Sequence, residues 1–81
     1  MAINGSIMTP LATIKEGDKV RVKNITGSDA VRKHLESMGF VSGSLVTVIQ
    51  ISFGNMILGI HDSRVAVNRD TAARVMVDPV G

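Results

Sequence analysis

The chain has no cysteine, no tryptophan and no tyrosine among its 81 residues. Without cysteine it can form neither a disulfide framework nor a thiolate metal site, so a hydrophobic core must stabilise the fold unaided. A hydrophobic content of 44% makes such a core feasible. This length corresponds to one small domain, which leaves no room for a second compartment and a deep catalytic cleft.

Aromatic side chains are scarce, since two phenylalanines are the only ones in the sequence. Small β-barrels that bind single-stranded nucleic acid usually stack the bases on aromatic rings. Grooves that bind proline-rich ligands are lined by aromatic residues as well. The scarcity therefore argues against both kinds of partner. A net charge of +2, from nine basic and seven acidic residues, does not by itself imply nucleic acid either.

Long apolar runs are also missing. No run approaches the roughly 18 apolar residues that a membrane helix needs, so we expect no direct membrane insertion. Residues 1–10 lack the basic start and apolar stretch of a secretory signal, and we expect a cytoplasmic protein. Residues 1–8 show no clear period and contain Gly5 and Ser6, which predicts a flexible N-terminal arm before a domain over residues 9–81.

Residues 28–43 carry the one complete helix signal in the sequence. Ser28 is a good N-cap, and Asp29 places a negative charge where the helix dipole favours one. Apolar residues then follow at helical spacing: Val31, Leu35 and Met38. Gly39 can adopt the left-handed conformation that ends a helix, and Phe40 is placed to fold back on it. The pattern predicts a short amphipathic helix that covers one end of a β-structure.

Most of the remaining chain is typical of short strands. Residues 19–23 alternate between basic and apolar side chains, which gives one positively charged face and one buried face. Ile25 breaks this alternation, which predicts either a β-bulge or the end of strand pairing before Thr26 and Gly27. Residues 45–51 are rich in β-branched side chains and predict a central strand, joined to the next strand by a turn at Gly54 and Asn55. Further strands are expected over three segments: 56–60, 64–68 and 75–77.

Two residues bear on how these strands assemble. Gly59 lies inside a strand pattern, where it is tolerated if the sheet bends or another backbone comes close. Asp70 is placed to cap a single helical turn over residues 71–73. Five or six short strands with one helix inserted after the first long strand predict a mainly β fold, a partly open antiparallel barrel.

No combination of residues in the sequence assembles a catalytic site, a metal site or a cofactor site. A nucleophile would need cysteine, or serine with a base and an orienting acid, so we predict no enzyme. His34 and Glu36 are two residues apart on a helix and face different directions. His61 and Asp62 share a turn, for which the ordinary explanation is a solvated turn and the alternative is a weak surface metal site. Neither histidine has the spacing of a recognised ligand set, and we predict no metal site and no cofactor.

Two sets of residues are candidate contact surfaces. The first combines charges of the helix with apolar residues after the helix and beside the 52–55 loop: Arg32, Lys33, Glu36, Phe40, Met56 and Ile57. The alternative is that the charges are solvated and that the phenylalanine and methionine pack inside the protein. The second set is the basic strand face: Lys19, Arg21 and Lys23. It would contact an acidic protein surface or phosphate, although exposed strand charges commonly serve only to prevent edge pairing.

The order and spacing of these features resemble the FeoA family over about residues 11–77. The resemblance rests on LESMGFVSG at residues 35–43 and on an A-x-x-V-x-V ending at residues 72–77. Further matching positions are Leu11, Ile14, Gly17, Val20, Ile25, Val46, Val48, Arg64, Val65, Ala66 and Val67. One departure is Ser42, where the family usually has proline before the glycine. Serine still suits a turn at that position.

The resemblance implies an SH3-like antiparallel β-barrel with one inserted α-helix and a short helical turn near the C-terminus. It also implies a bacterial accessory protein of ferrous iron transport, a non-enzymatic module that docks on the cytosolic part of the transporter FeoB and supports or regulates Fe(II) uptake. Two alternatives remain open. One is a nucleic-acid-binding barrel that uses the basic strand face. The other is a metal-binding or sensing module using His34 or His61, like the C-terminal domain of DtxR-type repressors, although we expect no DNA-binding region before it.

Overall fold

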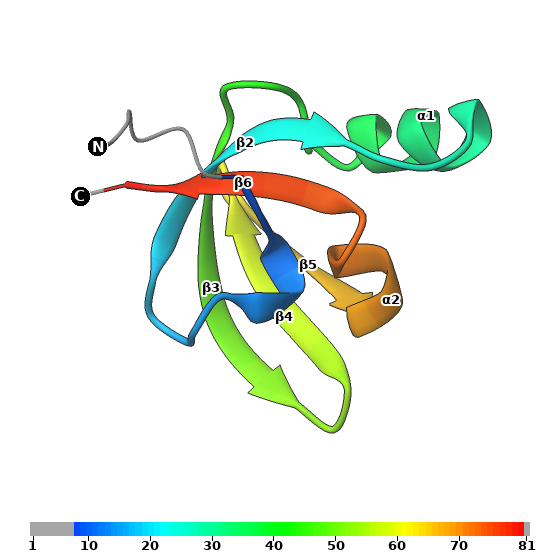
Figure 1. The fold of residues 1–81 in the computed structure, drawn as a ribbon. Helices are drawn as coiled ribbons and strands as arrows, with labels where there is room; N and C mark the ends of the chain where they lie inside the picture. The colour runs from blue at the N-terminus through cyan, green and yellow to red at the C-terminus, as the bar shows by residue number, and fades with distance from the viewer. Residues whose placement is uncertain (1–7, 81) are drawn as a thin grey trace.

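The computed structural model describes residues 8–80, and within them it confirms the predicted mainly β fold (Figure 1). In chain order the elements are β1 (Thr9–Pro10), the 3-10 helix η1 (Leu11–Thr13), β2 (Lys19–Ile25), α1 (Asp29–Ser37), β3 (Leu45–Ser52), β4 (Asn55–Ile60), β5 (Ser63–Asn68), α2 (Arg69–Ala72) and β6 (Val75–Pro79). The predicted arm lies outside the described residues except for Met8, which is exposed.

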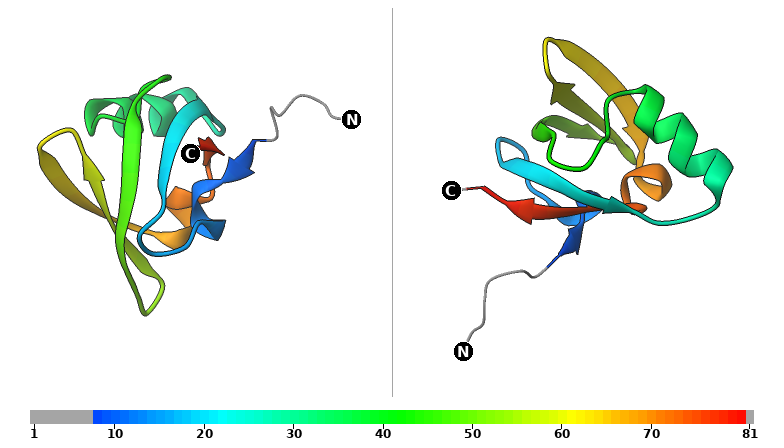
Figure 2. Two further views of the ribbon diagram at one scale, coloured as in Figure 1. Left: turned by 90° about the vertical axis from the view of Figure 1, so that its left-hand side faces the viewer. Right: turned by 90° about the horizontal axis from the view of Figure 1, so that it is seen from above.

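The strands form one antiparallel sheet in the order β1-β6-β2-β3-β4-β5. The sheet bends strongly, so that β2 and β6 cross over β3 and β4 (Figures 1 and 2). Its two edge strands, β1 and β5, are not hydrogen-bonded to each other. Instead η1, which follows β1, packs against α2, which follows β5. The structure is therefore a partly open barrel whose gap is bridged by these two short helical segments.

Helix α1 begins and ends where the sequence predicts. The Ser28 hydroxyl accepts a hydrogen bond from the Val31 backbone N–H at 3.3 Å. At the other end, Gly39 has a φ of +106°, and the Phe40 N–H donates to the Leu35 carbonyl at 3.1 Å. Together with the bond from the Gly39 N–H to the Glu36 carbonyl, this is a Schellman ending. The chain is thereby turned from α1 back towards the sheet.

The core is built from the inward faces of the strands and from one stripe of α1. Of the helix residues, Leu35 is fully buried, while Val31 and the C-cap Met38 are half-buried against the core. The remainder of α1 extends beyond the end of β2 (Figure 1). The buried apolar side chains are Leu11, Val20, Val22, Ile25, Leu35, Phe40, Val46, Val48, Met56, Leu58, Ile60, Val67, Ala72, Val75 and Val77.

The predicted irregularity in β2 is present. The register with β6 shifts between Val22 and Asn24, which leaves Lys23 as the extra residue of a bulge. Because of this shift, Ile25 faces the core together with Val20 and Val22, although a regular strand would place it on the opposite face. The bulge thus explains the broken alternation in the sequence.

One prediction about α2 is wrong. Asn68, and not Asp70, caps this helical turn, with its side-chain oxygen accepting from the Thr71 backbone N–H at 2.7 Å. Strand β5 ends at Asn68, so this residue occupies the extended position that an N-cap requires. Asp70 lies in the first turn of the helix, where its negative charge interacts favourably with the helix dipole.

Candidate functional site

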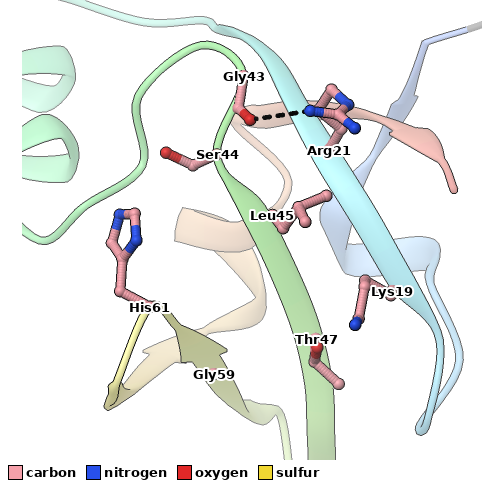
Figure 3. A pocket seen from close by; sticks show the side chains of 8 residues that line it. All are labelled: Lys19, Arg21, Gly43, Ser44, Leu45, Thr47, Gly59 and His61. Carbon is pink, nitrogen blue, oxygen red and sulfur yellow. Dashed lines mark hydrogen bonds between the residues drawn. The ribbon is translucent and has the colours of Figure 1, made fainter.

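The outer face of the sheet is hollowed over β2, β3 and the end of β4. An open basin of about 460 Å³ lies there (Figure 3). Its lining residues are Lys19, Arg21, Gly43, Ser44, Leu45, Thr47, Gly59 and His61. A second basin of about 290 Å³ shares three of them and continues along the sheet to Ile49, Asp62, Ser63 and Arg64. We call the two joined basins the basic trough.

Strand register brings these residues together. Lys19 pairs with Thr47, Thr47 with Gly59, and Gly59 with Arg64, so the four residues form one row across β2 to β5. Lys19 and Arg21 point outward because Val20, between them, faces the core. Local sequence patterns alone could not show that Lys19 and Arg64 lie at the two ends of one row.

Gly59 gives the trough its depth. A Cβ atom at this position would lie 3.2 Å from the Cδ1 atom of Ile49, which is tighter than ordinary van der Waals contact. Ile49 is the extra residue where the β3–β4 register shifts between Val48 and Gln50. The nearest neighbour of Gly59 is therefore the side chain of Ile49 and not another backbone, and the absence of a side chain at Gly59 keeps the floor open.

The trough carries a surplus of positive charge. Lys19 and Arg21 form one wall, and His61 projects from the opposite wall (Figure 3). Arg64 adds a cation at the far end, and Asp62 is the carboxylate among the lining residues. The Arg21 guanidinium donates to the Gly43 carbonyl at 3.2 Å, which holds this cation at the rim. Carboxylates and phosphates are the groups that such a surface attracts.

The three residues of the predicted basic strand face line two different depressions. Lys19 and Arg21 line the basic trough, but Lys23 does not. Its Nζ atom lies 3.6 Å from an Asp78 carboxylate oxygen, and it lines a small depression of about 80 Å³ beside α1. Asp78 is the cross-strand partner of Arg21, so Lys23 reaches the neighbour of Arg21 although it lines a different depression. That the three cations act as one contact surface stays a prediction.

Only some residues of the predicted helix surface are exposed in the structure. Arg32, Lys33 and Glu36 are exposed, and Arg32 pairs with Asp29 at 3.4 Å. Phe40 and Met56 are fully buried, so they belong to the core and the prediction that they contact a partner is wrong. Phe40 is buried because the Schellman ending of α1 turns it inward, and Met56 because it faces the core from β4. Ile57, on the other face of β4, is half-buried.

The two histidines are separated. His34 is exposed in the last turn of α1, and His61 lies in the turn between β4 and β5 with a φ of +55°. Among residues 8–80 no group of three or more histidine, aspartate or glutamate side chains is placed to hold a metal ion. The alternative in which His34 or His61 contributes to a metal site is therefore not supported by a ligand cluster in this part of the chain.

Phe53 is an exposed residue that the sequence analysis did not single out. It stands at the tip of the β3–β4 hairpin with its side chain fully exposed (103%) and with a φ of +45°. Gly54 beside it has a φ of +83°, and Ser52 pairs directly with Asn55, so the turn has two residues. The sequence did contain a signal for Phe53, because an aromatic residue is unusual in a turn that favours asparagine and glycine.

Comparison with known proteins identifies the family of this chain. The family model described as "FeoA domain" matches residues 9–79. The chain belongs to the FeoA family. A relative named "Putative Fe(2+) transport protein A", from Methanocaldococcus jannaschii, is 38% identical over 71 residues, which cover 88% of this chain and 87% of that protein. The FeoA resemblance drawn from the sequence is thus confirmed.

Solved structures agree with this assignment. The crystal structure of an iron uptake regulatory protein (FeoA) matches with a TM-score of 0.84 and 35% identity, covering 91% of this chain and 99% of that chain. A manganese-dependent transcriptional repressor matches with a TM-score of 0.82 and 18% identity, over 90% of this chain but 42% of the repressor. The second likeness shows the fold alone. The SH3-like fold implied by the FeoA resemblance is confirmed.

No helix within residues 8–80 is both long and apolar enough to cross a bilayer.

Proposed function

We propose that this FeoA-family chain is a cytoplasmic accessory protein of ferrous iron transport that docks on the cytosolic part of FeoB. It acts as a non-enzymatic module and supports or regulates Fe(II) uptake. Membership of the family and the 38% identical relative named for Fe(2+) transport support the transport role. FeoB as the partner follows from the family resemblance. The basic trough is the single structural observation that supports docking.

The trough suits a protein partner because it combines charge with apolar surface. Lys19 and Arg21 rise along one side, while Leu45 and Ile49 are 42% and 37% exposed along β3. Cations at a rim steer an acidic surface into register, and apolar surface supplies affinity when water leaves it. An acidic segment of the FeoB cytosolic domain fits these two requirements.

Binding between this chain and the purified cytosolic domain of FeoB tests the proposal by calorimetry. We expect a saturable complex whose affinity falls as salt is added, because the cations of the trough are solvent-exposed. The cellular counterpart is Fe(II) uptake in a strain that lacks this chain. Normal uptake in that strain, together with no binding to full-length FeoB, would rule the proposal out.

Nucleic acid is the second candidate, favoured by the cations Lys19, Arg21 and Arg64 along one depression. Against it, Phe40 is buried and Phe53 stands alone at a hairpin tip, so these rings make no platform for successive bases. Nucleic-acid binding predicts an affinity that falls steeply with salt. Lack of binding to RNA or DNA at low salt would remove this candidate.

A further inference from the structure

Phe53 combines an exposed ring with an unfavourable backbone conformation. Its ring is fully solvent-exposed, and its backbone has a φ of +45°, a region that residues other than glycine and asparagine seldom occupy. Residues held in such conformations are often found at functional sites. Asparagine would suit this turn better, so the structure of the hairpin does not explain why phenylalanine is there.

The turn that carries Phe53 is held in place from both sides. The Gly54 carbonyl accepts a hydrogen bond from the Arg69 backbone N–H at 2.9 Å, which ties the tip to the start of α2. On the other strand, the Ile51 backbone N–H donates to a carboxylate oxygen of Glu16 at 2.6 Å. The ring is therefore presented on a pre-organised support, which lowers the entropy lost when a partner binds it.

Phe53 follows two exposed apolar side chains of β3 along the chain. The described part of the chain has six large apolar residues that are exposed, and three of them lie on β3 and its turn: Leu45, Ile49 and Phe53. The first two line the basic trough. Phe53 follows Ile49 by four positions, so the rise of an extended strand sets an upper limit of about 13 Å, which the bulge at Ile49 and the turn shorten. A protein seated in the trough along β3 would thus meet the ring at the end of the strand.

We propose that Phe53 is an anchor that inserts into an apolar pocket on the cytosolic domain of FeoB when that domain occupies the basic trough. This inference rests on the proposed function and adds a contact residue to it. The ring has no polar atom, so only an apolar pocket compensates for its burial. The hairpin has charged residues of both signs near it, which does not favour an anionic membrane surface: Glu16 accepts from the Ile51 N–H, and Arg69, whose N–H bonds to Gly54, is followed by Asp70.

Calorimetry with the FeoB cytosolic domain tests the anchor. Phe53→Asn removes the ring and keeps a residue suited to the turn. We expect it to weaken binding by about 10- to 100-fold, the loss that corresponds to burying one such side chain. Phe53→Leu keeps a large apolar side chain without a polar atom and should lose much less affinity than Phe53→Asn. Val41→Asn changes another exposed apolar residue, which lies in the loop after α1, and should leave affinity unchanged.

The outcomes separate this inference from the proposed function. If the unmodified chain and Phe53→Asn bind FeoB equally well, the anchor is overturned and docking stands. If the unmodified chain does not bind, both are overturned. Sedimentation of the chain alone, and binding to vesicles of phosphatidylcholine and phosphatidylglycerol, test the other occupants. Self-association or vesicle binding that Phe53→Asn abolishes, without a change in FeoB affinity, would assign the ring to a second copy or to lipid.

Discussion

Phe53 lowers the free energy of unfolding, and a single substitution should restore it. A left-handed backbone costs a residue with a Cβ atom about 1–2 kcal/mol, and asparagine tolerates it better than phenylalanine. The ring is fully exposed, so its removal sacrifices no buried surface. We expect Phe53→Asn to stabilise the protein by about 1 kcal/mol and to raise Tm by about 4–8 °C. A thermal melt followed by circular dichroism measures this, and a lower Tm would show that the ring has stabilising contacts.

Gly39 is a residue where both backbone and space demand glycine. Its φ is +106°, and a Cβ atom there would lie 2.9 Å from the Cγ2 atom of Ile60, which is buried. Gly43 has a similar φ of +93° but nothing within 4 Å of its added Cβ. Gly39→Ala should therefore lower the free energy of unfolding by more than the roughly 1–2 kcal/mol that strain alone costs in Gly43→Ala. Denaturant unfolding of both variants gives the comparison, and equal losses would mean that Ile60 moves aside freely.

At the scale of elements, α1 could be predicted because its signals are local. The N-cap Ser28, the apolar spacing and Gly39 all act within one or two helical turns, and the structure has each in its expected role. The strands were predictable from alternation and β-branching for the same reason. Asn68 was missed as the cap of α2 because that choice depends on where β5 stops pairing with β4.

The candidate site was less predictable because it depends on contacts between distant segments. The bulge at Lys23 is a property of the register of β2 with β6, and Lys23 lines a different depression from Lys19 and Arg21. His61 reaches the trough only because β4 lies beside β3. A one-residue shift in pairing reverses which face a side chain occupies, so sequence patterns alone could not settle these positions.

Leu35 tests how far α1 stabilises the fold. It is the one residue of α1 that is fully buried. We expect Leu35→Ala to cost about 2–5 kcal/mol, because it removes core volume that the neighbours cannot refill completely. His34→Ala changes the adjacent exposed residue and should stay within about 0.5 kcal/mol of the unmodified chain. Denaturant unfolding compares the two, and an unchanged midpoint for Leu35→Ala would mean that α1 does not cover the core.

At the scale of the whole molecule, two charged surfaces compete as the place where FeoB docks. On α1, Arg32 and Lys33 are balanced by Asp29 and Glu36, and Arg32 is already paired with Asp29. The basic trough has a surplus of cations and lies next to exposed apolar side chains of β3. Electrostatic complementarity therefore favours the trough as the docking surface for an acidic partner.

Two double charge reversals decide between these surfaces. Lys19→Glu with Arg21→Glu changes the trough, and Arg32→Glu with Lys33→Glu changes the helix. Each reversal replaces one positive charge by one negative charge, so both variants go from the net charge of +2 to −2, a change of 4 in each. Any long-range effect of net charge is thus matched.

We expect the trough variant to bind the FeoB cytosolic domain at least about tenfold more weakly, because like charges would then face each other at close range. The helix variant should lose little, and the difference should shrink as salt screens the exposed charges. If the helix variant loses more affinity than the trough variant, FeoB docks on α1 and the trough is left without this role.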